Sequence, residues 1–564
     1  MRPLDWLVLA GWLGFIVVYG VWRGGRSRDT RSFLLAGREM GWLTVLISIM
    51  ATQASAITFL STPGQAYVDG MRFVQFYFGL PLAMIVLSAV ALPLYFRLKV
   101  YTAYEFLEGR FDLKTRTLTA FLFLLQRGLA CGLTIYAPSL ILSVILGWDI
   151  RVTIAIIGAA VVVYTTTGGT RAVSRTHVLQ AGLILAGMAA AFVVLVAKLP
   201  PDVSLLDATR IAGQAGKLNA IDLSVNLTDR YTLWSGLIGG FFLALSYFGT
   251  DQSQVQRYLQ GRSLADSRMG LVLNGLLKVP MQFAILFVGA AVFAFYLFTA
   301  PPVFFNPIET AKVRASAVAG EFAAVEARYG EAVGVREARA RELTRTLDGG
   351  DPVAKDAATA AFRTASDEAA AVRGEAIALI KRADPNANPS DTNYVFLTFV
   401  VSHLPAGLLG LMLAAVFAAS MNSVSSELNA LASTTVVDVY RRLVRTDASE
   451  RHYVWAARAA TLGWGAFAIA FAENASRLGS LVEAVNILGS LFYGTILGVF
   501  LVAFFVKRVG GSAVFAAAIG AEAIVVASYA FAPISFLWLN LVGCVAVIVL
   551  ALALQPLVRG RATP

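Results

Sequence analysis

Charged residues are scarce in this chain: aspartate, glutamate, lysine and arginine together make up 14% of its 564 residues. Hydrophobic residues account for 57%, and the mean hydropathy is +0.69. This composition excludes an ordinary soluble domain, so most of the length must lie in lipid. The net charge of +11 does not indicate nucleic-acid binding, because nearly all basic residues lie between apolar runs, where they act as topology signals.

Cysteine and histidine are also rare, with two and three residues. Cys131 and Cys544 each lie inside an apolar run, which argues against a disulfide framework or a metal cluster. The sequence has no phosphate-binding loop with lysine and no HExxH motif, and no acid–base pair lies at one depth of the predicted spans. We therefore expect neither an enzyme nor a cofactor.

The predicted fold class is an all-α polytopic membrane protein with thirteen transmembrane helices. Basic residues follow every second apolar run, which places the N-terminus outside and the C-terminus in the cytoplasm. The first run is too long and too poorly flanked for a cleaved signal peptide. Ala- and Arg-rich usage is compatible with a bacterial inner membrane protein, and a monomer is expected. The predicted spans are 4–22, 41–69, 73–96, 117–147, 150–167, 172–199, 233–250, 268–299, 405–438, 453–472, 479–506, 511–532 and 534–555.

The second span is organised around Ile47–Tyr67, which reads ISIMATQASAITFLSTPGQAY. Small and hydroxyl residues fill its centre, and Pro63-Gly64 follow one turn later. These residues make a poor lipid-facing surface. They suit a helix that breaks in mid-membrane and leaves carbonyl groups free for a cation or a solute. The alternative is a seam of small residues against which another helix packs closely.

A second interruption is predicted in 233–250, where an apolar run gives way to Ser246-Tyr247-Phe248-Gly249-Thr250-Asp251-Gln252. It comes five spans after the first. Two five-helix units separated by an odd offset are inverted relative to each other, and interrupted helices at matching positions mark the central site of a transporter. The alternative is a span that ends normally at Gly249.

The ninth span carries seven polar residues within ten positions, which a lipid-facing helix has no reason to carry. Hydroxyl, amide and carbonyl oxygens are the neutral hard ligands that suit Na⁺, because the ion itself supplies the charge. Ala419, Asn422 and Ser423 share one helical face. The alternative is hydrogen bonding between helices. The polar residues are Ser420, Asn422, Ser423, Ser425, Ser426, Glu427 and Asn429.

The loop from about 300 to 392 interrupts the membrane pattern. It predicts a helix over Glu309–Arg345, a turn at Asp348–Pro352 and a second helix over Val353–Ile380. We expect an extracytoplasmic helical hairpin of mixed charge, loosely packed or exposed to solvent. A lid or a partner-docking element is the alternative.

Several motifs in order resemble the sodium/solute symporter family, which includes sodium–galactose, sodium–proline and sodium–sialic acid carriers. The sialic-acid-type members look most similar. The resemblance covers roughly residues 5 to 530 and omits the hairpin. The motifs are FLLAGR at 33–38, SAITFLSTPGQAY at 55–67, YEFLEGRF at 104–111, TGGTRAV at 167–173, Gln256-Arg257, and the ninth span with Asp438-Val439-Tyr440.

The resemblance implies a five-plus-five inverted-repeat fold of the LeuT type, with discontinuous helices and alternating access. The first repeat would span 41–199, and the second 233–308 with 385–506. Residues 1–40 and 507–564 would be terminal additions, and 309–384 the inserted hairpin. The implied partners are a small solute (a sugar, sugar acid or carboxylate), Na⁺ and the lipid bilayer.

The implied sodium ligands are the carbonyl groups of Ala51, Ala54 and Ala419 with the side chains of Asn422 and Ser423. The family usually has Ser or Thr where Asn422 stands, and an amide oxygen can still coordinate. His177 stands where many members have an aspartate that supports sodium binding. It is either a neutral hydrogen-bonding residue or a titrating group for proton coupling.

The resemblance also implies a solute site. Lys278 lies deep in the eighth span and should face a cavity or a carboxylate, since burying a lysine in lipid is costly. Sugar-reading groups and the carboxylate-binding arginine of relatives are absent, with Ala130 at the arginine position and Arg127 as a substitute one turn earlier. The expected solute residues are Ser55, Thr58, Gln75, Tyr77, Tyr247, Lys278 and Asn486.

The sequence thus predicts a sodium-coupled symporter of a small organic solute. One alternative is a proton-coupled symporter that uses His177. The other is a transporter-like solute sensor that acts through a partner docked on the 309–384 hairpin.

Overall fold

The structure is a computed structural model that describes residues 2–24, 38–349, 351–475 and 478–558. Within these residues all regular elements are helices, apart from one isolated bridge between Met40 and Gly261. In the described part of the chain, nine helical stretches are long and apolar enough to cross a membrane, and four shorter apolar helices accompany them. An all-α polytopic membrane protein is therefore confirmed. The count of thirteen spans and the inverted repeat stay predictions.

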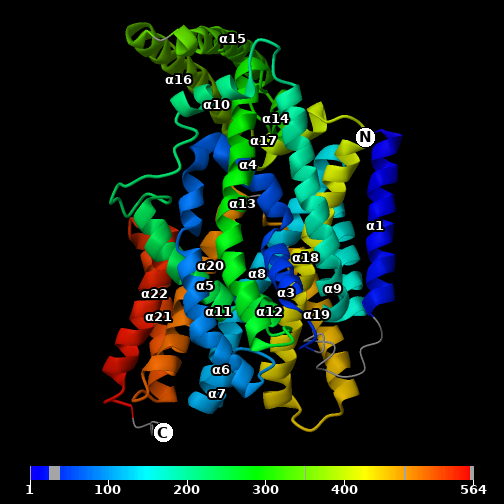
Figure 1. The fold of residues 1–564 in the computed structure, drawn as a ribbon, viewed down its shortest axis with the longest axis vertical. Coiled ribbons are helices and arrows are strands. Elements are labelled where there is room, and N and C mark those ends of the chain that lie inside the picture. Colours follow the sequence, from blue (N-terminus) through cyan, green and yellow to red (C-terminus); the bar gives the residue numbers. More distant parts are fainter. Residues whose placement is uncertain (1, 25–37, 350, 476–477, 559–564) are drawn as a thin grey trace.

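The bundle is bounded by α1 (Pro3–Gly24) on one side and by α21 (Gly511–Phe531) and α22 (Phe536–Leu554) on the other (Figure 1). The start of α1 and the end of α22 lie at opposite ends of the molecule, as an odd number of crossings would require. The central helices are α8 (Leu113–Leu146), α13 (Leu264–Phe298), α18 (Leu408–Thr434) with a π-helical extension η4 (Thr435–Val444), α19 (Glu450–Ala472) and α20 (Leu481–Phe505).

The first predicted break is present. Helix α3 (Trp42–Gln53) stops before Ala54, and α4 (Ala56–Asp69) starts after Ser55, whose backbone is extended at φ −77° and ψ 172°. Pro63 lies inside α4 without ending it. A short 3₁₀ helix, η2 (Gly70–Tyr77), then leads to α5 (Leu80–Ala89) and α6 (Ala91–Leu98), so the third span is less regular than predicted.

The second predicted break is present too. A π-helical turn, η3 (Ser235–Gly239), continues into α11 (Gly240–Gly249). The chain then leaves helical geometry at Thr250 and Asp251 before α12 (Gln252–Tyr258). The Asp251 side chain caps α12 by accepting from the backbone N–H of Ser253 at 2.9 Å. Because every residue of α12 is buried, the chain after Gly249 forms a second buried helical segment and not a polar loop. The alternative of a span that simply ends at Gly249 is therefore wrong.

The fifth and sixth predicted spans fall in one helical element, α9 (Ile150–Ala197), with apolar stretches at 150–166 and 177–197. The side chains of 167–176, including the whole TGGTRAV motif, lie outside the described residues. The first stretch runs antiparallel to α19, because Gly158 lies against Ile469 and Val162 against Gly465. The second runs antiparallel to α18, because Gly187 lies against Met412, while Lys198 at the end of α9 is close enough to act electrostatically on His403, which comes before α18. The two stretches therefore cross in opposite directions, as two spans would.

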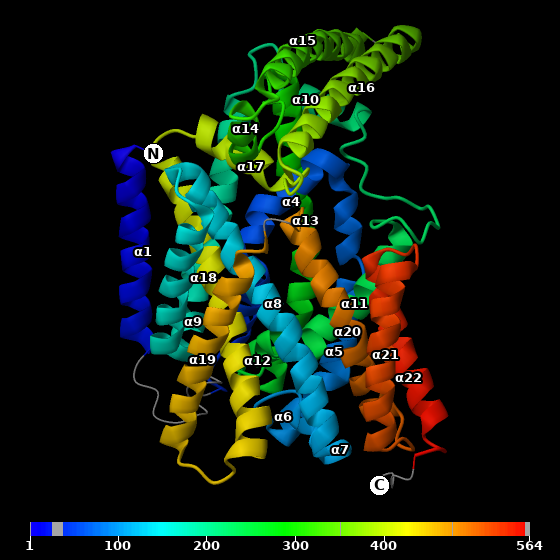
Figure 2. The same cartoon turned by 180° about the vertical axis from the view of Figure 1, so that it is seen from behind.

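The predicted hairpin is present as α15 (Ala319–Gly349) and α16 (Pro352–Ala383), preceded by α14 (Pro307–Arg314). It projects from one end of the molecule, which we call the hairpin side (Figures 1 and 2). The expectation of loose packing is wrong for its inner faces: Phe322 and Phe362 are fully buried, and Phe362 packs in one apolar cluster with Leu297 of α13. Two helices on this side were not predicted, α10 (Leu205–Gln214) and α17 (Thr392–His403).

Two of the resembling motifs meet at the opposite end of the bundle. Glu108, in α7 (Glu105–Arg110), forms an ion pair with Arg116 of α8 at 2.6 Å. Asp438, from the end of the ninth span, forms an ion pair with Arg116 at 2.7 Å. These contacts join α8 to the end of α18, so these motif residues hold the scaffold together and bind no solute. The FLLAGR motif lies, except for Arg38, outside the described residues.

Candidate functional site

Helix α18 lies directly against the first break. The Ser423 hydroxyl donates to the backbone carbonyl of Thr52 at 3.0 Å, and the hydroxyls of Thr52 and Ser426 are 3.3 Å apart. The Thr58 hydroxyl donates to the carbonyl of Gln53 at 3.2 Å. A helix end leaves carbonyl groups without intrahelical partners. Here the hydroxyl of Ser423 on α18 and that of Thr58 on α4 satisfy two of them.

The five predicted sodium ligands lie on these two facing segments, three on α18 and two at the end of α3. All five are at least nine-tenths buried. Among the described residues, the amide nitrogen of Asn422 is buried without a hydrogen-bond partner. Backbone carbonyl, amide and hydroxyl oxygens at one buried junction form a donor set of the kind that suits Na⁺. The residues are Ala51, Ala54, Ala419, Asn422 and Ser423.

A polar cavity of about 130 Å³ lies between the two broken helices. Ser423 also lines it, so this cavity borders the candidate ion site. Six of the seven predicted solute residues line it: Ser55, Thr58, Tyr77, Tyr247, Lys278 and Asn486.

The prediction for Gln75 is wrong. Its side-chain amide donates to the carbonyl of Tyr231 at 2.8 Å and accepts the backbone N–H of Asp222 at 2.9 Å. Gln75 thus holds the chain after α10 against η2, outside the cavity. The prediction treats this part of the third span as a regular α-helix, whereas η2 is a 3₁₀ helix. The tighter winding changes which side chains share a face.

Lys278 is the residue that most distinguishes this cavity. It is 1% exposed, and its ammonium group lies 5.8 Å from the ring centre of Tyr77. Among the described residues no carboxylate lies within ion-pair distance of it. A buried cation without an anion is costly, so an anion entering the cavity would remove that cost.

Sequence reasoning missed the charged cluster at one wall of the cavity. Arg127 of α8 forms ion pairs with Asp251 at the second break and with Glu427 of α18, the latter at 3.0 Å. Its guanidinium also donates to the Tyr493 hydroxyl at 2.6 Å. Since two carboxylates already occupy Arg127, the idea that it replaces a solute-binding arginine at Ala130 is wrong. The available signal was three buried ionisable residues, one on each of three spans.

His177 lies on the other side of α3. Its Nδ1 is 3.1 Å from the Ser48 hydroxyl, one turn before Thr52, and the residue is fully buried. Its Nε2 has no hydrogen-bond partner among the residues that the structure describes. This position couples His177 to the helix that breaks, although not to the cavity.

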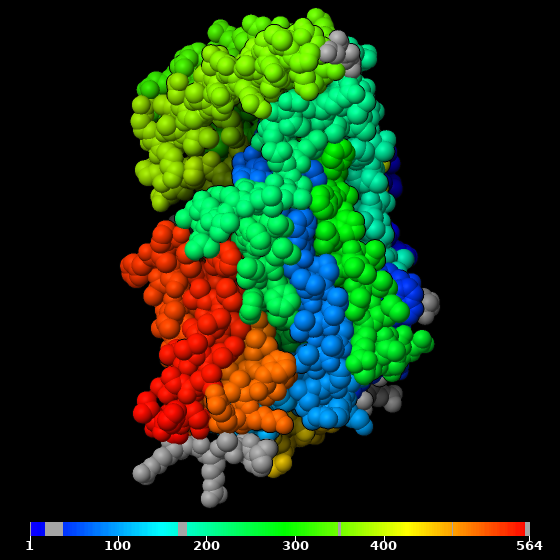
Figure 3. All heavy atoms as spheres, turned by 60° about the vertical axis from the view of Figure 1, so that its left-hand side comes forward, coloured from blue at the N-terminus to red at the C-terminus, as the bar shows by residue number. Residues whose placement is uncertain are grey.

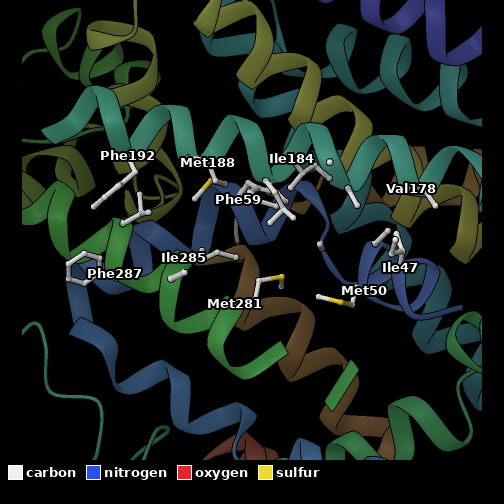
Figure 4. Close-up of a pocket in the computed structure, with 18 residues that line it drawn as sticks. Ile47, Met50, Phe59, Val178, Ile184, Met188, Phe192, Met281, Ile285 and Phe287 are labelled. Carbon is white, nitrogen blue, oxygen red and sulfur yellow. The ribbon is translucent and has the colours of Figure 1, made fainter. Parts of the chain in front are cut away.

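A larger cavity of about 550 Å³ lies beside the first break, between α3, α4, α9 and α13 (Figure 4). Its walls are apolar side chains such as Met50, Phe59, Met188, Phe192 and Met281. Ala51 and Ala54 border it as well. With no charged or hydrogen-bonding side chain in its lining, this cavity cannot recognise a hydrophilic solute.

Comparison with known proteins gives one family. A model of the sodium:solute symporter family matches residues 33–327 and 373–520. The sodium-coupled monocarboxylate transporter 1 of Homo sapiens is 27% identical over 88% of this chain and 68% of its own length. The sodium/sialic acid symporter SiaT of Proteus mirabilis is 25% identical, covering 98% of this chain and 95% of its own. The solved outward-open state of a Na⁺-coupled sialic acid symporter superposes with a TM-score of 0.76 over the full length of both chains at 22% identity.

Proposed function

The chain belongs to the sodium:solute symporter family, and from that premise we propose that the solute it carries is a small organic anion bound by Lys278. The protein is a sodium-coupled symporter of a small organic solute and not an enzyme. Family membership therefore favours sodium symport over both a proton-coupled carrier and a solute sensor. What remains to be assigned is the solute and the residues that hold it.

The unpaired ammonium group of Lys278 carries the proposal. A carboxylate in the cavity would supply its missing counter-ion and could accept a hydrogen bond from the Ser55 hydroxyl as well. The relatives named for monocarboxylates and for sialic acid carry solutes of this charge. The volume of about 130 Å³ is well below that of a pocket for a drug-sized ligand, which favours a short monocarboxylate over a sugar acid.

For the ion we propose the carbonyl groups of Ala51, Ala54 and Ala419 with the side chains of Asn422 and Ser423. Na⁺ bound between α3 and α18 would fix the first broken helix against the scaffold, in the conformation that forms the solute cavity. Each ligand would then raise the affinity for the other by the same factor. For His177 we propose a neutral role, in which it orients α3 through Ser48.

The architecture that supports this mechanism is a five-plus-five inverted repeat. The two interrupted helices, α3–α4 and α11–α12, would occupy matching positions in the two repeats. By the positive-inside rule the hairpin side is outside and the C-terminus is cytoplasmic. We propose a monomer in a bacterial inner membrane.

Uptake of radiolabelled lactate into liposomes that contain the purified protein tests the proposal. An inward sodium gradient should drive accumulation, a potassium gradient should not, and Lys278→Met should abolish it. The His177→Gln variant should keep its sodium dependence. Accumulation driven by a pH gradient without sodium, lost in His177→Gln, would instead support proton coupling. Sodium-driven uptake that Lys278→Met leaves unchanged would refute the assignment of the anion site.

A further inference from the structure

A second polar cavity lies on the hairpin side, away from the broken helices. Its volume is about 750 Å³, and its walls come from α15, α16, the end of α4 and the turn after α10. Figure 3 shows the hairpin projecting over the segments below it, with a hollow beneath. Most of the hairpin, residues 328–372, falls outside the stretches that the family model matches. This cavity is therefore a feature of the inserted segment.

Its lining is strongly basic. Four cationic side chains and one carboxylate, that of Asp367, line the cavity, so the formal charge of the lining is 4 − 1 = +3. Arg373 is paired with Asp391 at 2.6 Å, which lowers the balance to +2. The remaining cations are Lys217, Arg336 and Arg363, and among the described residues no carboxylate lies within 4.0 Å of Arg336 or Arg363.

Arg336 is the most informative of these residues. It is 9% exposed, and its one recorded hydrogen bond runs from the guanidinium to the carbonyl of Tyr296 at 3.0 Å. Its Nε is buried without a partner among the described residues. A buried guanidinium with a spare donor and no counter-ion is a ready partner for an oxyanion, which it can bind through two parallel hydrogen bonds.

The rest of the wall is aromatic. Tyr67, Phe293, Tyr329 and Phe362 all border the cavity, and the Lys217 ammonium lies 4.9 Å from the ring centre of Phe293. Aromatic faces next to cations suit a ligand with a flat apolar body and an anionic group. We propose that this cavity is a second binding site, for an organic carboxylate with an aromatic or apolar body, held by Arg336, Arg363 and Lys217.

Such a ligand would connect the hairpin to the first broken helix. Lys217 donates to the carbonyl of Val68 at the end of α4, and its own carbonyl accepts the backbone N–H of Met71 at 2.9 Å. Arg336 and Arg363 belong to the hairpin. A carboxylate bound between these groups would bridge α15 and α16 to the end of α4. The site does not depend on the proposed solute at Lys278.

Equilibrium binding of radiolabelled benzoate to the full-length protein tests the proposal. The measurement is made in potassium buffer without sodium, on a Lys278→Met background, so that the central cavity does not contribute. Saturable binding is expected there. Arg336→Gln should weaken it by at least about tenfold, the usual cost of losing a charge-assisted hydrogen bond, and Arg363→Gln should weaken it in the same direction.

Arg339→Gln is the matched control, because Arg339 lies on the same helix, exposed and paired with Glu342 at 2.7 Å. It should bind benzoate like the parent. A symmetric size-exclusion profile and an unchanged sodium-dependent thermal shift would show that each variant is folded. Arg363→Gln also keeps the test decisive if Arg336→Gln fails to fold. The proposal is overturned if the Lys278→Met protein shows no saturable binding, or if the folded Arg336 and Arg363 variants bind like Arg339→Gln. Failure of lactate uptake with benzoate binding intact would refute only the proposed solute.

Discussion

Ser423→Ala is the substitution that best separates an ion site from ordinary helix packing. The Ser423 hydroxyl is buried and donates to the carbonyl of Thr52 across the first break. Removing it deletes one hydrogen bond between α18 and α3, which should lower the stability by about 1 kcal/mol in any buffer. If the oxygen also coordinates Na⁺, a second loss should appear only in sodium.

The size of that second loss follows from mass action. A ligand present at about 100 times its Kd stabilises the folded state by about 2.7 kcal/mol. Loss of a contact to a charged group costs about 1.5 kcal/mol or more, which is about a tenfold weaker Kd. At the same sodium concentration the stabilisation should then fall to about 1.4 kcal/mol. The sodium concentration needed for a given stabilisation should rise about tenfold.

The assay is thermal unfolding of the purified protein, with sodium replacing potassium at constant ionic strength. Ser425→Ala is the matched control, because Ser425 is equally buried on the same helix but donates to the carbonyls of Met421 and Asn422 within α18. It should keep the parental sodium response. If Ser423→Ala unfolds earlier in both buffers yet gains the parental stabilisation at each sodium concentration, the hydroxyl is a packing contact and the ligand assignment fails.

Three other predictions concern charged side chains. Lys278→Arg should retain sodium-driven lactate uptake with a raised KM, since it keeps the charge but changes the geometry; a KM equal to that of the parent would contradict the placement. Arg127→Met should lower the stability by about 3–5 kcal/mol, because two buried carboxylates lose their partner, and a parental melting temperature would refute this. Burial lowers the pKa of Lys217 to about 8, a shift that Asp69 opposes and Arg72 reinforces. Benzoate binding on the hairpin side should therefore weaken as the pH rises through about 8, where Lys217 loses its charge while the arginines keep theirs, and a flat profile from about pH 7 to about 9.5 would exclude Lys217.

The helix breaks could be predicted from sequence because their cause is local. Small and hydroxyl residues around Ala54 remove the apolar side chains that a lipid-facing helix needs, and the same holds at Ser246–Gln252. The ninth span was predictable for a similar reason, since seven polar residues in ten positions have few uses in a membrane. In each case the residues themselves supply the signal. The structure then places the first break and the ninth span in contact.

The partners of buried charges could not be predicted in this way. Arg127 was recognised as unusual, yet its two carboxylate partners lie 124 and 300 residues further along the chain, and no local pattern specifies which of several buried groups it meets. Gln75 fails for a related reason. Its environment depends on a 3₁₀ turn and on a loop about 150 residues away, so tertiary contacts decided its role.

The two cations of the central cavity differ in whether the chain supplies their counter-ions. At the central cavity, Arg127 is matched by Asp251 and Glu427, which leaves Lys278 as the one cation there with no acidic partner among the described residues. The guanidinium cluster can therefore hold α8, α18 and the second break together while the lysine stays available. If Lys278 were instead paired within the protein, a solute carboxylate would have to break an existing ion pair before it could bind. An unpaired lysine avoids that cost. The binding free energy of the solute can then stabilise the state in which the cavity is closed around it.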